Sequence, residues 1–85
     1  MLFELDKSIV RSLVNDDVLE ERIFELALQG KRKYPMTAQA SLLAASTFVV
    51  CKLEGIRVNQ ADMTRLFGVN NVSIRRDIQR ILKMI

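Results

Sequence analysis

Cationic side chains recur along the last helical stretch of this chain, with a spacing that suits recognition of a polyanion. Residues 70–85 read NNVSIRRDIQRILKMI. Isoleucine recurs at positions 74, 78, 81 and 85, which is the spacing of one buried face of an α-helix. The opposite face then carries the polar side chains of Arg75, Arg76, Gln79, Arg80 and Lys83.

The side chains at the start of this helix have the chemistry that reads DNA bases. Arginine can donate two hydrogen bonds to one guanine, and valine can contact the methyl group of thymine. Cations further along such a helix are better placed for phosphates. We therefore expect base contacts from Asn70, Asn71, Val72, Arg75 and Arg76, and backbone contacts from Gln60, Arg80 and Lys83. The plainer interpretation is a basic face that is only solvated.

A short helix and a turn precede this helix, and together they predict a helix-turn-helix over residues 59–84. Asn59 is expected to cap the short helix, and Gly68 to end it. Thr64 is small enough for a helix crossing, and Asn70 is expected to cap the following helix. The side chains expected to point inward from this unit are Met63, Leu66, Phe67, Val69 and the four isoleucines, with Leu82 beside them.

The elements that must position this unit are organised around Thr37–Glu54, which reads TAQASLLAASTFVVCKLE. Its apolar residues do not keep to one face, so a helix here must be surrounded by protein. Thr37 is expected to cap this helix and Gly55 to end it. Its polar interruptions argue against a membrane span. The predicted fold is all-α, a single domain over 1–85 with a buried central helix.

Two amphipathic helices are expected before the central one. The first covers residues 2–14, with Leu2, Leu5, Ile9 and Leu13 along one stripe. The second is expected to begin with Asp17 as its cap, with Glu20 completing a capping box, and to stop at Gly30. Residues 31–35 then form a basic connector whose lysines and arginine could touch phosphates. We assign Tyr34 no role beyond packing.

Charge is distributed unevenly between the two halves of the chain. Residues 1–30 carry three basic and seven acidic side chains, whereas residues 31–85 carry ten basic and three acidic ones. The second half therefore suits a polyanion, and the first half does not.

Most catalytic chemistry is excluded by composition. The chain has no histidine and one cysteine, Cys51, so zinc-finger spacing and a Cys–His pair are both absent. Asp62 fits a cap and Asp77 a local ion pair with Arg76 or Arg80, so neither predicts a catalytic carboxylate pair. No enzyme activity, metal or cofactor is expected. The start of the chain, MLFELDK, lacks a signal-peptide pattern, which favours a cytoplasmic location.

Residues 40–82, ASLLAASTFVVCKLEGIRVNQADMTRLFGVNNVSIRRDIQRIL, resemble a known family. They are similar to the second cyclin-like repeat of archaeal transcription factor B and eukaryotic transcription factor IIB. The resemblance lies in the Ala-rich helix ending in Leu-Glu-Gly, in Asn59-Gln60, and in Gly-Val followed by Val-Ser-Ile-Arg. It covers about the last 50 residues and implies a five-helix cyclin-like bundle.

In that family, the resemblance implies, this helix-turn-helix reads the promoter element beside the TATA box. Base contacts from the valine and arginine of Val-Ser-Ile-Arg carry over to Val72 and Arg75. The complete factors also have a zinc ribbon and a first repeat, and this chain contains neither. Arg76-Asp77 departs from the family's usual sequence, so the base preference need not be the same.

Several alternatives stay open at this point. The chain is either an excised repeat or a stand-alone transcription regulator, and archaeal, other prokaryotic (cytoplasmic) and eukaryotic (nuclear) settings all fit. Double-stranded DNA is the expected partner, with the TATA-binding protein or another transcription protein beside it, and a dimer is compatible with so small a DNA-facing surface. The alternative function is a cyclin-fold adaptor that binds protein without reading DNA.

Overall fold

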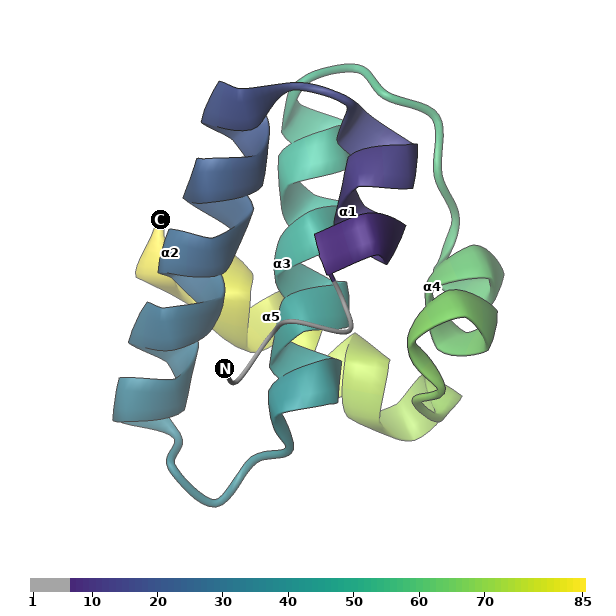
Figure 1. Cartoon of the computed structure of the whole chain (residues 1–85). Coiled ribbons are helices and arrows are strands. Elements are labelled where there is room, and N and C mark those ends of the chain that lie inside the picture. The colour runs from purple at the N-terminus through teal and green to yellow at the C-terminus, as the bar shows by residue number, and fades with distance from the viewer. Residues whose placement is uncertain (1–6) are drawn as a thin grey trace.

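The computed structural model describes residues 7–85, and this part of the chain folds into five α-helices with no strand (Figure 1). The helices are α1 (Lys7–Val14), α2 (Asp17–Lys33), α3 (Gln39–Leu53), α4 (Gln60–Phe67) and α5 (Asn71–Met84). They form one compact globule, which confirms the all-α prediction. Leu2 and Leu5 of the expected first stripe lie outside the described residues.

Helix α3 is the centre of the molecule, as its sequence predicted. Figure 1 shows it in teal between α2 on one side and α4 on the other, with α5 crossing behind it. Ten of its fifteen residues are buried, including Ser41, Ser46 and Thr47. The hydroxyl groups of Ser46 and Thr47 donate to the carbonyl oxygens of Leu42 and Leu43, 2.8 Å away in each case. The polar interruptions of this helix are therefore satisfied inside the core.

None of the helices in the described part of the chain combines the length and the apolar character that crossing a bilayer requires.

The start of α2 differs from the prediction by one residue. Asp16, not Asp17, is the N-cap, and its carboxylate accepts from the backbone N–H groups of Val18 and Leu19 at 2.9 and 3.0 Å. The predicted capping box is also wrong, because Glu20 turns inward and pairs with Arg11 of α1 at 3.0 Å. That ion pair ties α1 to α2.

The end of α2 also differs. The helix continues past Gly30 to Lys33, so the predicted basic connector is instead the last turn of the helix. Gly30 is a packing residue: a Cβ there would lie 3.2 Å from Leu42 Cδ2 and 3.3 Å from Ile81 Cδ1. Glycine at this position lets α2 approach both α3 and α5 closely.

The other helix boundaries follow the expected signals, with one exception. Gly55 and Gly68 have positive φ angles of 76° and 66° just after α3 and α4, as predicted. Thr37 does not cap α3: the cap position is Ala38, with no side-chain hydrogen bond. Thr37 is instead buried, and its side chain contacts α5.

Helix α5 lies across α3 with its isoleucine face inward. Ile74, Ile78 and Ile81 are buried, which confirms the central part of the predicted ladder. Ile85 and Leu82 are exceptions, 57% and 47% exposed, whereas Met84 between them packs partly buried against the core. Leu66 of α4 was also expected inside and is 37% exposed, whereas Met63 and Phe67 are buried.

Candidate nucleic-acid interface

Helices α4 and α5 are joined by the short turn that the sequence predicted. The Asn59 side chain accepts from the N–H of Asp62 at 2.8 Å and starts α4. Gly68 adopts the left-handed conformation, and its N–H donates to the carbonyl of Thr64. Because Met63 and Phe67 pack into the same core as the α5 isoleucines, the turn fixes α5 relative to α4.

One row of exposed side chains follows the outer face of α5. Val72 is 77% exposed, which is high for a large apolar side chain. Arg75, Arg76, Gln79 and Lys83 are exposed with it, at the helical spacing of a single face. Gln79 was recognised in the sequence as outward-facing but was not assigned a contact, and it belongs to this row.

The free side chains of the row are the ones best able to bind a ligand. Arg75 and Lys83 make no hydrogen bond or ion pair with any described residue. Val72 contributes nothing to the core, which consists of other residues. These three side chains therefore have no role within the described fold.

Asn70 has a structural role that limits what else it can do. Its side-chain oxygen accepts from the backbone N–H of Ser73 at 2.7 Å and caps α5. Its amide NH₂ and the second lone pair of its oxygen are left for a partner. Asn71, the first residue of α5, is exposed and its side chain is free of such a bond.

This difference predicts unequal effects on stability. We expect Asn70→Ala to lower the free energy of unfolding by about 1 kcal/mol, the usual loss for an N-cap. Asn71→Ala, the matched control one residue on, should leave it within about 0.5 kcal/mol. Urea denaturation followed by circular dichroism measures both. Equal effects of the two substitutions would contradict the assigned cap.

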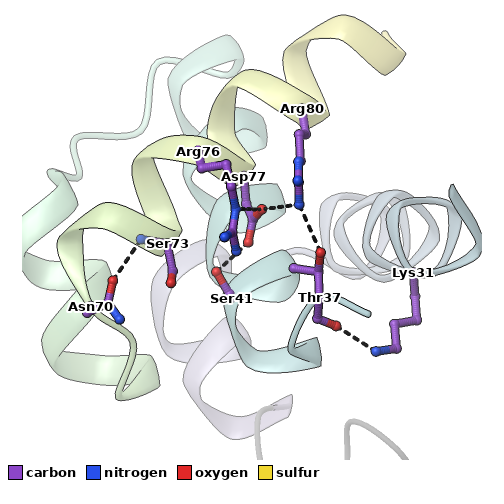
Figure 2. Close-up of polar contacts among 8 residues, drawn as sticks. All are labelled: Lys31, Thr37, Ser41, Asn70, Ser73, Arg76, Asp77 and Arg80. Carbon is purple, nitrogen blue, oxygen red and sulfur yellow. Dashed lines mark hydrogen bonds and ion pairs between the residues drawn. The ribbon is translucent and has the colours of Figure 1, made fainter. Parts of the chain in front are cut away.

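A buried carboxylate lies beneath the outer face of α5. Asp77 is 0% exposed and accepts hydrogen bonds from three side chains, as Figure 2 shows. Ser41 of α3 donates from its hydroxyl group at 2.5 Å, Arg76 from Nε at 3.1 Å and Arg80 from Nη1 at 3.3 Å. The ion pair predicted with one of the two arginines is therefore made with both.

This carboxylate changes what the two arginines offer to a ligand. Arg80 is only 29% exposed and also donates to the hydroxyl group of Thr37 at 2.8 Å, so its predicted phosphate contact is restricted. Arg76 is 47% exposed and uses only Nε internally. Its two terminal nitrogens stay available for base or phosphate. Arg75 is the one α5 arginine without an internal partner among the described residues.

The loop between α2 and α3 contributes to the same region through contacts that sequence reasoning missed. The guanidinium carbon of Arg80 lies 4.3 Å from the centroid of the Tyr34 ring, and Lys33 Nζ lies 5.9 Å from it. Lys31 Nζ donates to the carbonyl of Thr37 at 2.6 Å (Figure 2). Tyr34 therefore joins the end of α2 to α5, which spacing along the chain gave no means of predicting.

Two predicted residues are less well placed. Gln60 is half-buried at the end of α4 remote from Gly68, so it is separated from the first turns of α5. Arg80, as described, is held against Asp77 and Thr37. The residues that the structure brings together on one exposed surface are Asn71, Val72, Arg75, Arg76, Gln79 and Lys83.

Other chemistry has little support in the described residues. Among residues 7–85, no three His, Cys, Asp or Glu side chains lie close enough to hold a metal ion. Cys51 is buried in α3, and desolvation raises the pKa of its thiol above the usual value, so the unreactive protonated form is favoured.

No protein-family model, curated protein or solved structure matches the chain in sequence or fold comparisons.

Proposed function

We propose that this protein is a sequence-specific DNA-binding module of a transcription factor, with a cyclin-like bundle whose α4 and α5 act as a helix-turn-helix. The observation that carries the proposal is the first half of α5. Its inner face is locked into the core by Ile74 and Ile78, while Val72 and Arg75 stand exposed with no structural role. That combination is what a recognition helix requires.

In this proposal the first turns of α5 enter the major groove of duplex DNA. Arg75 donates to a guanine edge, and Val72 contacts the methyl group of a thymine. Arg76 adds its free terminal nitrogens to a base or an adjacent phosphate. Asn71, at the start of the row, contacts a base edge. Lys83, at its other end, binds a phosphate and helps to set the register of the helix along the groove.

The test is a titration of the protein into random and selected DNA duplexes over a range of salt concentrations. Selection from a random pool should enrich one sequence, and affinity for it should fall linearly on a log–log plot against salt, because phosphate contacts release counterions. A chain that enriches no sequence and binds no duplex at low salt would overturn the proposal.

A groove in the acidic first half of the chain supports a second candidate function, a protein-binding adaptor. It has a volume of about 440 Å³ and lies along α1 and α2. Its lining includes the carboxylates of Asp17, Glu21 and Glu25, together with Lys7 and the Arg11–Glu20 ion pair, so acidic groups are in excess. Such a groove suits a Lys/Arg-rich helical segment. Binding of a basic helical peptide that Glu21→Lys abolishes, together with no binding to DNA, would favour this candidate.

A further inference from the structure

We propose that Lys33 and Tyr34, at the junction of α2 and α3, form a second contact to the same DNA duplex, on a phosphate beside the groove that α5 occupies. This inference rests on the proposed function. It adds a site outside the helix-turn-helix and names its ligand as the sugar–phosphate backbone. Together with Arg80, these residues are called the Tyr34 cluster below.

The geometry of the Tyr34 cluster brings together side chains from two distant parts of the chain. Lys33 ends α2, Tyr34 follows it, and Arg80 belongs to α5. Both cations lie around one aromatic ring, with Arg80 Cζ 4.3 Å and Lys33 Nζ 5.9 Å from its centroid. Attraction between a cation and the ring quadrupole holds such an arrangement.

The donors of the cluster are not used up inside the protein. Lys33 makes no ion pair with any described carboxylate, and the hydroxyl group of Tyr34 has no hydrogen-bond partner among the described residues. The Lys33 ammonium group and the Tyr34 hydroxyl group therefore offer free donors, whereas Arg80 is engaged with Thr37 and Asp77. A phosphate oxygen is the acceptor that such a set suits, and lysine, arginine and tyrosine all bind phosphates in DNA complexes.

One member of the cluster, Arg80, and the adjoining loop are held in place, which favours binding. Arg80 is fixed by Thr37 and by buried Asp77, at 2.8 and 3.3 Å. Lys31 fastens the loop by its bond to the Thr37 carbonyl at 2.6 Å. A preorganised surface loses little conformational entropy when a ligand binds.

The same duplex is the favoured ligand because the cluster is continuous with the α5 surface. Arg80 is one helical turn after Arg76, and Arg76 belongs to the exposed row of α5. A helix in the major groove is flanked by the phosphates of both DNA strands. Cationic side chains beside that helix therefore face the sugar–phosphate backbone of the DNA. An acidic protein is the other ligand for this chemistry, and the test separates the two.

The test compares Lys33→Gln, Tyr34→Phe and the matched control Arg22→Gln in the whole chain. Arg22 is an exposed cation on the same helix, so its substitution changes the net charge equally. Fluorescence anisotropy with the selected duplex gives affinity against salt for each variant. Phosphate-ethylation interference then identifies which phosphates each variant needs.

We expect Lys33→Gln to make the log–log salt slope shallower by about 1, as loss of one phosphate contact should. Tyr34→Phe keeps the ring and should weaken binding with the slope unchanged. Ethylation of one flanking phosphate should prevent binding of the wild-type protein and should not affect binding of Lys33→Gln. Arg22→Gln should match the wild-type protein in slope and interference.

The possible failures are distinguishable. If the wild-type chain binds duplex DNA but Lys33→Gln and Arg22→Gln give the same slope and the same interference pattern, this inference is wrong and the proposed function stands. If the wild-type chain binds no duplex, the proposed function fails first. If Lys33 only stabilises the end of α2 through its charge, Lys33→Gln should lower the melting temperature without changing the interference pattern. That result would also overturn the inference.

Discussion

Replacing Asp77 with alanine is expected to destabilise the protein by about 3 kcal/mol, the lower end of the range for breaking a buried ion pair. Asp77 is fully buried and accepts from Ser41, Arg76 and Arg80. Its removal leaves the buried Ser41 hydroxyl group without an acceptor and two guanidinium groups without a counter-charge. Both arginines reach solvent, so the loss should not approach the upper limit.

Urea or thermal denaturation measures this loss, and the melting temperature should fall by roughly 12–24 °C for a domain of this size. Asp62→Ala is the matched control, since Asp62 makes a single ion pair with Arg65 at the surface of α4. Its loss should stay below about 1 kcal/mol. Asp77→Asn, which keeps one acceptor oxygen, should fall between the two. An Asp77→Ala variant as stable as Asp62→Ala would show that the buried cluster does not hold α5 to α3.

Replacing Arg75 with alanine is expected to cost about 1–3 kcal/mol of DNA-binding free energy at one base pair, which is roughly 5- to 150-fold in affinity for the preferred duplex. Arg75 is exposed and has no internal partner among residues 7–85, so the substitution should leave the fold intact. Binding to a duplex altered at that base pair should change little. Arg75→Ala should therefore lose sequence preference, while its affinity for duplex DNA of other sequences changes little.

Lys83→Ala serves as the control for this experiment. Lys83 lies two turns further along α5, is also exposed, and is assigned to a phosphate. Its loss should weaken preferred and altered duplexes alike and make the salt slope shallower by about 1. Identical behaviour of the two variants, measured on both duplexes, would contradict the assignment of Arg75 to a base.

The local signals of the sequence were sufficient for the second half of the fold. Asn59 and Asn70 cap α4 and α5 through their own side chains, and Gly68 takes the left-handed conformation between them. Each of these depends on residues within a few positions, which propensity rules describe well. The burial of α3 followed from apolar residues on all its faces, and the burial of the central isoleucines followed from their helical spacing.

The first half departs from prediction where tertiary contacts compete with local signals. Gly30 was expected to end α2. Instead it lies within the helix, where the absence of a side chain lets Leu42 and Ile81 pack closely against its backbone. Thr37 was expected to cap α3 and instead accepts from Arg80, which is 43 residues away. Glycine and threonine are both common at helix ends, and only the packed structure shows that these two residues serve in tertiary contacts instead.

The sequence was sufficient to predict which side chains of the candidate site are exposed, but not which of them make internal contacts. The sequence placed Val72 and Arg75 on the outer face, and both are exposed. It did not reveal that Asp77 would be buried beneath them and bind both neighbouring arginines, because that needs Ser41 from another helix. The packing of Tyr34 against Arg80 is equally long-range.

A nuclear magnetic resonance titration can show whether the exposed row of α5 is the surface that contacts DNA. Amide signals of the ¹⁵N-labelled protein are followed as the selected duplex is added. We expect the largest shifts at residues 71–76 of α5 and at 33–34, with α1 and the first turns of α2 unchanged. Shifts concentrated on the acidic surface of α1 and α2, with Val72 and Arg75 unaffected, would contradict it.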